Sequence, residues 1–386
     1  MTIKTIETQH TSGVYAKRDL VIVRGEGATL WDEQGNEYID CVGGQGAANL
    51  GHAHPAIAAA ISEQATRLIS CPEMFYNDTR AKLLAKLTSL APAGMQRAFL
   101  TNSGTEAVEA AFKFARFSTK RTKIIASMRG FHGRSMGALS ATWNKKYRAP
   151  FTPLVPDIHH VPYNNLEKLA TEIDENTAAV ILEVVQGEGG VHPGDAEYFQ
   201  GAQELCRQHG ALLIIDEIQT GFGRTGKMFA LEHFDLQPDI LTVAKSIAGG
   251  VPMGATLLGE RVAELAPGIH GSTFGGNPLA AAASLAALNA LEDEQLPQRA
   301  AELGAYLLNE LNKIESPLIR DVRGMGLMIG IEIKQKVAPF IAALTERGIL
   351  ALPAGLTVIR LLPPLVITRE QLDRVIEALT EILNAE

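Results

Sequence analysis

The chain has 386 residues, enough for two or three domains at roughly 150 residues each. Acidic residues outnumber basic ones by 43 to 35, so the formal net charge is −8. This balance, without basic runs, argues against a partner that is nucleic acid or a membrane surface. A hydrophobic fraction of 46% and a charged fraction of 20% exclude a disordered chain.

The sequence also predicts a cytoplasmic location. Residues 1–7 contain no apolar segment typical of a signal peptide. The most apolar stretch, residues 278–291, is shorter than the ~20 residues that a membrane span needs. Three scattered cysteines form neither a disulfide framework nor a CxxC pair.

The N-terminal part predicts a hairpin, with strands at residues 28–32 and 37–40 around a Gln-Gly-Asn turn. From about residue 97 to 245, short apolar runs alternate with helical patterns. We expect strands at 98–100, 123–126, 178–182, 211–215 and 240–244, and helices at 105–116 and 195–208. Continuous apolar strands separated by helices indicate a mostly parallel sheet that is covered on both faces.

The C-terminal part follows other patterns. Residues 330–333 alternate as in a half-exposed strand, and residues 369–383 have the spacing of an amphipathic helix. We therefore expect an α/β protein with a large domain at residues 46–280. A smaller α+β domain would comprise residues 281–386, joined by the N-terminal segment 1–45.

Four groups of residues follow predicted strands, where open α/β sheets bind their ligands. Ser103, Gly104 and Thr105 begin a helix whose amides would favour an anion such as phosphate, although a simple helix cap is the alternative. Asp216 follows five apolar residues, where a buried charge needs a positive partner; the alternative is that it only caps a turn. Lys245 directly follows the apolar run 240–244. It is a candidate Schiff-base amine, and the alternative is a lysine whose amine reaches solvent.

The fourth group is Phe131-His132-Gly133-Arg134, aromatic and cationic residues in a glycine-bracketed loop. A hydrophobic plug beside a surface charge is the alternative. Taken together, a phosphate cradle, an aromatic face, a carboxylate for a pyridinium nitrogen and an imine-forming lysine are what pyridoxal 5′-phosphate (PLP) requires.

Order and context of these groups resemble the class III (ornithine-type) aminotransferases of fold type I. The resemblance runs from Gly51 to Arg360 and is carried by separated motifs. These are Asn102-Ser103-Gly104-Thr105-Glu106-Ala107, Phe131-His132-Gly133-Arg134, Gln186-Gly187-Glu188, Asp216-Glu217-Ile218-Gln219-Thr220-Gly221 and His270-Gly271-Ser272-Thr273-Phe274-Gly275-Gly276-Asn277-Pro278.

The resemblance implies a role for each matching residue. Lys245 would carry the cofactor and move the proton, and Asp216 would pair with the pyridinium nitrogen. Gln219 would contact the phenolic oxygen and Phe131 the ring face, while Ser103, Gly104 and Thr105 would hold the phosphate.

Further roles implied by the resemblance concern the substrate and the oligomer. Ser272 and Thr273 would reach across a homodimer interface, Thr273 to the phosphate and Ser272 towards the substrate. Arg134 would contact a substrate carboxylate, and Arg360 would bind the α-carboxylate of glutamate with Glu183 as its partner. The family commonly has Pro after that Glu, where this chain has Val184, so the backbone bend there is open.

Two other motifs fail. Residues 221–228 nearly spell a P-loop, but Met228 stands where the Ser or Thr that binds Mg²⁺ would be. Gly44 begins a dinucleotide-like segment that lacks the third glycine. His52 and His54 have no third ligand at metal spacing and fit a turn before a helix that starts at Pro55, so we expect no metal.

Within the family, the chain looks most like acetylornithine aminotransferases and those acting on lysine or ornithine linked to an amino-group carrier protein. The resemblance implies transfer of a terminal amino group between an N2-blocked diamine and 2-oxoglutarate or glutamate, in arginine or lysine biosynthesis. Whether the blocking group is acetyl, succinyl or a carrier protein stays open. Ornithine and 4-aminobutyrate aminotransferases are alternatives, as is a catalytically silent structural homologue.

Overall fold

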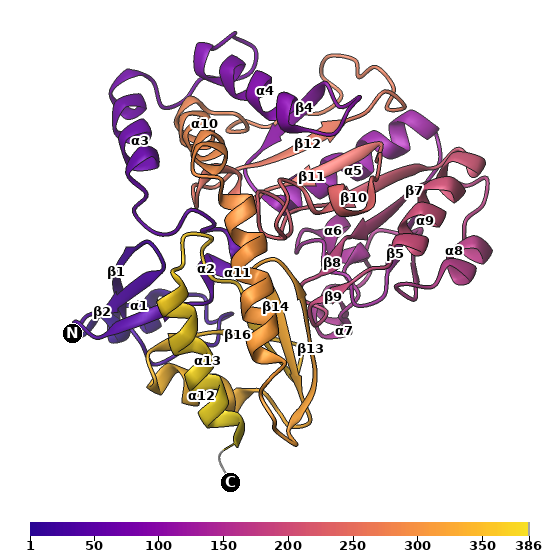
Figure 1. The fold of residues 1–386 in the computed structure, drawn as a ribbon. Helices are drawn as coiled ribbons and strands as arrows, with labels where there is room; N and C mark the ends of the chain where they lie inside the picture. The colour runs from indigo at the N-terminus through magenta and orange to yellow at the C-terminus, as the bar shows by residue number, and fades with distance from the viewer. Residues whose placement is uncertain (385–386) are drawn as a thin grey trace.

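A computed structural model describes residues 1–384 and contains a large, seven-stranded central sheet (Figure 1). The strand order is β4-β12-β11-β10-β7-β5-β6. Pairing is parallel from β11 to β6, while β12 runs antiparallel to both its neighbours. The mostly parallel sheet expected from the apolar runs is confirmed. Its strands are β4 (Arg97–Thr101), β5 (Lys123–Ser127), β6 (Ile158–Val161), β7 (Thr177–Glu183), β10 (Leu212–Asp216), β11 (Ile240–Val243) and β12 (Gly254–Leu258).

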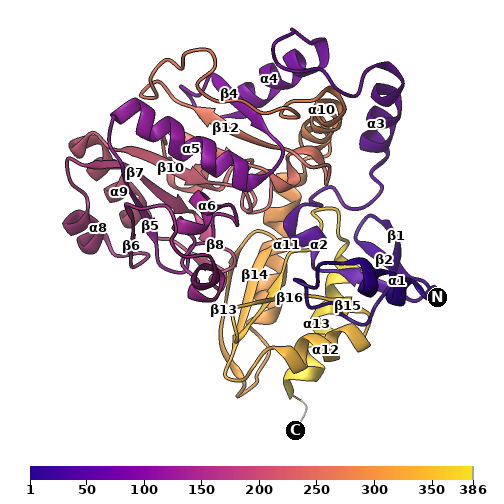
Figure 2. The same ribbon diagram turned by 180° about the vertical axis from the view of Figure 1, so that it is seen from behind.

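Helices cover both faces of this sheet, which explains why its strands are apolar at successive positions. Ile124 of β5 packs in the same cluster as Phe112 of α5 (Gly104–Thr119), and the next residue, Ile125, packs in the cluster of Phe199 of α9 (Ala196–His209). Successive strand residues point to opposite faces, so each face needs its own apolar set. Figure 2 shows α5 across one face, and α8 (Leu166–Glu172) lies beside α9 at the edge.

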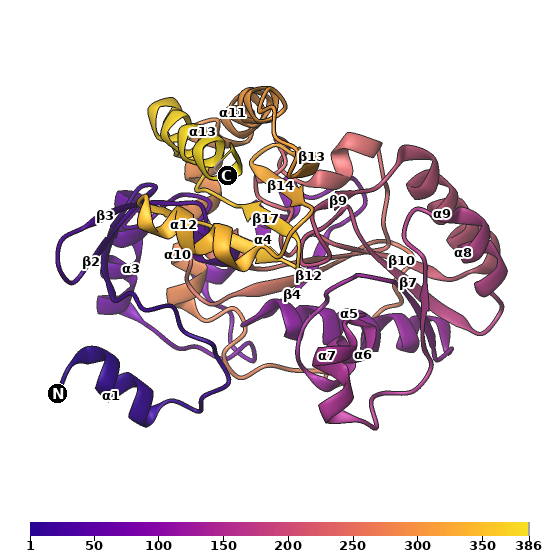
Figure 3. The same ribbon diagram turned by 90° about the horizontal axis from the view of Figure 1, so that it is seen from below.

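The C-terminal part forms a second sheet in the order β13-β14-β17-β16. Its strands are β13 (Ile319–Met325), β14 (Met328–Ile333), β16 (Leu352–Ala354) and β17 (Val358–Leu361). The strand expected at residues 330–333 is part of β14, but its expected half-exposure is wrong, since only Glu332 in it is partly exposed. Gly330 explains this burial, because Val191, which follows β8, packs on it and covers that face. On the other side lie α11 (Leu296–Leu311), α12 (Ala338–Glu346) and α13 (Arg369–Asn384), as Figure 3 shows.

The N-terminal strands lie beside the C-terminal part. The expected hairpin is confirmed as β2 (Thr29–Asp32) and β3 (Glu37–Asp40), flanked by β1 (Ile22–Glu26). β3 also pairs in parallel with β15 (Ile349–Leu350), more than 300 residues further along the chain. The expected domain boundary at residue 280 falls inside α10 (Pro278–Asp293), which packs on α3 (Pro55–Arg67) and α4 (Asp78–Leu90).

Shorter elements complete the described chain: α1 (Ile3–His10), α2 (Gly43–Gly46), α6 (Met136–Ala141), α7 (Lys145–Arg148), η1 (Ala149–Phe151), β8 (Val185–Gln186), β9 (His192–Pro193), η2 (Ala230–Phe234) and η3 (Lys245–Ala248). Over residues 1–384 we find no helix long and apolar enough to cross a bilayer. The same residues contain no group of three or more His, Cys, Asp or Glu side chains arranged to hold a metal ion.

Candidate active site

A cavity of about 390 Å³ opens where β4, β5, β7, β10 and β11 end, within the size range of small-molecule sites. Because parallel strands end at one edge of the sheet, residues far apart in sequence meet there. The structure brings together most of the residues singled out from the sequence, and the cavity is lined by Ser103, Gly104, Thr105, Phe131, Arg134, Glu183, Asp216, Gln219 and Lys245 among others.

The N-terminus of α5 forms one wall of the cavity. Ser103 caps the helix by accepting a hydrogen bond from the Glu106 amide at 3.4 Å. Thr105 Oγ1 lies 2.6 Å from Ser135 Oγ. Gly104 lets the first turn approach β10, because a Cβ there would come within 2.9 Å of the Ile218 side chain. The first amides of the helix and its dipole therefore face a space suited to an anion.

Asp216 ends β10 and lies buried in the wall of the cavity. One carboxylate oxygen lies 2.7 Å from Nδ1 of His132, and the other accepts the Ile218 amide at 3.0 Å. Burial alone would lower the pKa of His132, but the hydrogen bond and charge of Asp216, with the charge of Glu183, raise it. Within the described chain the Nε2 atom of His132 has no hydrogen-bond partner. Sequence reasoning assigned no role to His132, although it lies in a quoted motif.

Lys245 follows β11 and projects half-buried into the cavity. Its backbone has a φ of 47°, a left-handed conformation that is uncommon for a residue with a side chain. Burial, opposed by the negative charge of Glu188, lowers the pKa of Lys245 to about 8. A sizeable fraction of its amine is therefore neutral, and so nucleophilic, near neutral pH.

Arg360 of β17 is 2% exposed and contacts Gln219, which lines the cavity. Its Nη1 lies 2.7 Å from Oε1 of Glu188 and 3.3 Å from Oε1 of Gln219. Burial would raise the pKa of Glu188, but the positive charges of Arg360, Lys245 and Arg134 lower it. This carboxylate is therefore ionised and neutralises Arg360.

The expected pairing of Glu183 with Arg360 is wrong. Glu183 ends β7 in register with Asp216, and its carboxylate accepts the amides of Phe131 at 3.0 Å and Gly187 at 3.4 Å. Burial raises the pKa of Glu183 to about 7. Glu183 lines the cavity and anchors the turn that follows it, while Glu188, five residues on, reaches Arg360. The quoted Gln186-Gly187-Glu188 motif was the signal that sequence reasoning left unused.

The remaining expected residues lie at the mouth of the cavity or outside it. The guanidinium of Arg134 lies 3.7 Å from the ring centre of Tyr147 and 5.5 Å from that of Phe131. Ser272 accepts a hydrogen bond from Asn102 at 3.1 Å, and with Thr273 it lines a neighbouring cavity. These two residues do not reach the Lys245 cavity within one described chain.

The residues present fit PLP. The open end of α5 suits a phosphate, Phe131 offers a ring face, and a buried carboxylate and a weakly basic lysine lie on the same cavity. A Cβ at Gly104 would collide with Ile218, which lines the same cavity, so a side chain at residue 104 would disturb this wall.

Comparisons with known proteins identify the family of the chain. The family profile Aminotransferase class-III matches residues 12–383. A LysW-aminoadipate semialdehyde transaminase of Deinococcus radiodurans is 53% identical over 98% of this chain and 89% of its own length. An acetylornithine aminotransferase of Methanothermobacter thermautotrophicus is 46% identical over 98% of this chain and 97% of its own.

Solved structures share the fold over nearly the whole chain. An ornithine aminotransferase of Toxoplasma gondii, whose crystal structure has PLP at partial occupancy in the active site, is similar with a TM-score of 0.94 and 36% identity. That similarity covers 98% of this chain and 93% of the other. The chain therefore belongs to the class III aminotransferases, PLP-dependent enzymes of fold type I.

Proposed function

We propose that this aminotransferase moves the terminal amino group between an N2-blocked diamino acid and 2-oxoglutarate or glutamate, in arginine or lysine biosynthesis. N2-acetylornithine and carrier-linked lysine or ornithine are the proposed diamines. The names of the Deinococcus and Methanothermobacter relatives support these substrates. The observation that carries the proposal is the ion pair between Arg360 and Glu188 beside Lys245.

The cavity offers a residue for each task that amino transfer requires. When bound, PLP supplies an aldehyde that takes up the amino group and a ring that withdraws electrons from the reacting carbon. Ser103, Gly104 and Thr105 would hold its phosphate, and Asp216 its ring nitrogen. Lys245, with its lowered pKa, would accept and return the proton at the reacting carbon.

Arg360 and Glu188 would let one site accept two unlike substrates. Glutamate reacts at its α-carbon, so its α-carboxylate lies beside the reacting centre and suits a planar guanidinium fork. A blocked diamine reacts at its terminal methylene and has no charge there, so an unpaired buried arginine would be costly. Glu188 at 2.7 Å removes that cost when the diamine is bound. Arg134 at the mouth would bind the distal carboxylate.

We also propose a homodimer with shared sites. Phe274, next to Thr273, is 60% exposed, and Phe75 and Tyr76 are exposed on a loop that Arg80 ties to Gly276. This apolar surface adjoins the two residues expected to act in the partner subunit. The cytoplasm remains our proposed location, supported by three cysteines that are all free thiols.

Stopped-flow absorbance of the bound cofactor tests the substrates by following each half-reaction alone. The holoenzyme is mixed with glutamate, N2-acetylornithine, N2-succinylornithine, ornithine or 4-aminobutyrate. We expect the two N2-blocked diamines to react faster than free ornithine and 4-aminobutyrate. Faster reaction of ornithine would favour the free-ornithine alternative, in line with the Toxoplasma structure.

Variants of the ion pair test the mechanism. Arg360→Ala should slow the glutamate half-reaction by at least about 10- to 150-fold, the value of a charged hydrogen bond of roughly 1.5–3 kcal/mol. The diamine half-reaction should change far less, and Glu188→Gln should have the opposite effect. Glu183→Gln is the matched control, because that carboxyl contacts backbone amides and should not separate the two half-reactions. If Arg360→Ala slowed both half-reactions equally, Arg360 would not exchange Glu188 for the glutamate carboxylate.

A further inference from the structure

The turn that carries Glu188 contacts the second sheet at one residue on each of three neighbouring strands. Arg323 of β13 is in register with Gly330 of β14, and Gly330 is in register with Arg360 of β17. Directly opposed residues of an antiparallel sheet project to the same face, so the two arginines flank a glycine on one face. Arg360 binds Glu188, and Val191 packs over Gly330.

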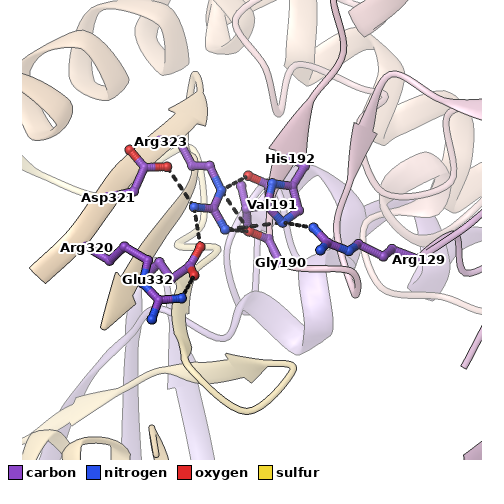
Figure 4. Close-up of polar contacts among 8 residues, drawn as sticks. All are labelled: Arg129, Gly190, Val191, His192, Arg320, Asp321, Arg323 and Glu332. Carbon is purple, nitrogen blue, oxygen red and sulfur yellow. Dashed lines mark hydrogen bonds and ion pairs between the residues drawn. The ribbon is translucent and has the colours of Figure 1, made fainter. Parts of the chain in front are cut away.

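Arg323 binds the other end of this turn through its backbone. Its Nε donates to the carbonyls of Gly190 at 3.1 Å and Val191 at 2.9 Å, and Nη2 donates to Gly190 at 2.6 Å (Figure 4). Nη2 also lies 3.3 Å from Nε2 of His192, which Arg129 approaches at the same distance. Burial and the two arginine charges lower the pKa of His192 to about 4, so its ring is neutral and accepts.

The backbone held in this way is strained. Val191 has a φ of 54°, and a β-branched residue in the left-handed region is a true outlier that only its surroundings can maintain. A Cβ at Gly330 would lie 2.8 Å from Cβ of Val191, so the valine seats where the sheet has no side chain. Without the bonds from Arg323, the turn would relax towards ordinary backbone geometry.

The charge of Arg323 is balanced inside its own sheet. Its Nη1 lies 2.8 Å from Glu332 and 2.7 Å from Asp321. Arg320 binds the other oxygen of Glu332 at 2.9 Å, but its side chain is 58% exposed, against 13% for Arg323, and in Figure 4 it lies on the side of Glu332 away from the turn. The two arginines therefore share an ion-pair partner and differ in their contact with the turn.

We infer that Arg323 is a positioning residue, which fixes the strained turn at Gly190 and Val191 so that Glu188 meets Arg360. Glu183 anchors the start of the turn through the Gly187 amide, and Arg323 anchors its end from the other domain. Arg323 thereby sets how well Arg360 is neutralised when the diamine binds. This inference rests on the proposed function, because it concerns the partner that Glu188 offers to Arg360.

Amide hydrogen exchange of the holoenzyme tests the positioning directly, without any substrate. In Arg323→Gln, the peptide spanning residues 186–193 should exchange at least about 10-fold faster than in the wild type, since several charged hydrogen bonds are lost. Arg320→Gln is the matched control and should leave that peptide unchanged. Equal protection in the Arg323 and Arg320 variants would overturn the inference.

Half-reactions then show whether the positioning affects the substrate choice. Arg323→Gln should slow the reaction of the fastest blocked diamine from the screen above by about 10-fold. Its reaction with glutamate should change less than about 2-fold, because glutamate needs Arg360 free. Arg323→Lys keeps the charge beside Glu332 without the planar fork, so it should restore only part of the loss. Full restoration by lysine would refute the role of the fork.

Two further variants separate the possible failures. Gly330→Ala displaces Val191 while leaving Arg323 in place, so it should reproduce the selective slowing even if Arg323→Gln fails to fold. Glu188→Gln should add little when combined with Arg323→Gln, since both act on one contact. If Glu188→Gln alone has no selective effect, the exchange of partners in the proposed function fails, and hydrogen exchange alone decides the role of Arg323. If Glu188→Gln is selective and Arg323→Gln slows both half-reactions equally, the inference is wrong.

Discussion

Replacing Asp216 by asparagine should slow both half-reactions to the same extent. The change keeps the shape of the side chain but removes the negative charge that lies 2.7 Å from His132. A hydrogen bond to a charged group contributes roughly 1.5–3 kcal/mol, which corresponds to about 10- to 150-fold in rate. The loss should be common to glutamate and the diamine, because both need the same electron-withdrawing ring, in contrast to the selective effects at Arg360 and Glu188.

A neighbouring buried carboxyl provides the matched control. Glu217 follows Asp216 in the chain and is fully buried, but it contacts Thr220 and accepts the Leu231 amide at 2.7 Å instead of lining the cavity. Burial raises the pKa of Glu217 to about 7, so Glu217→Gln replaces a group of which about half is already neutral at pH 7. Stopped-flow half-reactions of this variant should stay within about 2-fold of the wild type. Unchanged rates in Asp216→Asn would show that Asp216 only caps the turn at Ile218.

Asp216→Asn should also reverse the contribution that His132 makes to the pH dependence of stability. Because Asp216 and Glu183 raise the pKa of His132 above its unfolded value of about 6.5, protonation of His132 stabilises the fold below that pH. This stabilisation is lost as pH rises through the higher folded pKa. Without the Asp216 carboxylate, burial dominates, so the variant should lose stability as pH falls through about 6.5. Melting temperatures of the cofactor-free proteins across this range measure the difference, and parallel pH profiles would refute the coupling.

The remaining predictions concern the cofactor lysine and the subunit interface. Lys245→Ala should fold but bind no cofactor covalently. In the wild type, peptide mapping after borohydride reduction should find PLP attached to Lys245. PLP attached to Lys227 would contradict the assignment. Covalent capture of PLP by the cofactor-free enzyme should accelerate as pH rises towards about 8, where the pKa of Lys245 lies, and a rate that is flat across this range would count against a neutral amine. In a mixed dimer of Lys245→Ala and Thr273→Ala subunits, one shared site would carry both substitutions and the other neither, so activity should return. Refolded mixtures that stay inactive would argue against shared sites.

Local patterns predicted the framework of this site because burial imposes them. A strand covered on both faces is apolar at nearly every position, so residues 211–215 and 240–244 stand out in the sequence. Asp216 and Lys245 interrupt such runs at the carboxyl edge, and parallel pairing then brings them to one cavity. β12 escaped prediction because no α-helix separates it from β11, only η3 and a Gly-Gly-Val-Pro turn, and because it runs antiparallel to β11.

The error at Glu183 shows where such patterns stop. Glu183 ends β7 and Glu188 lies five residues further on, and distance along the chain does not say which carboxylate reaches β17. That choice depends on the register of the second sheet, which places Gly330 between Arg323 and Arg360. Val191 seats on this glycine in a backbone conformation that its own side chain disfavours. A local rule is thus overruled by contacts from the second sheet, as is common at functional sites. The same contacts direct Glu188 to Arg360. The ion pair that sequence reasoning missed and the strained backbone of Val191 therefore have one cause.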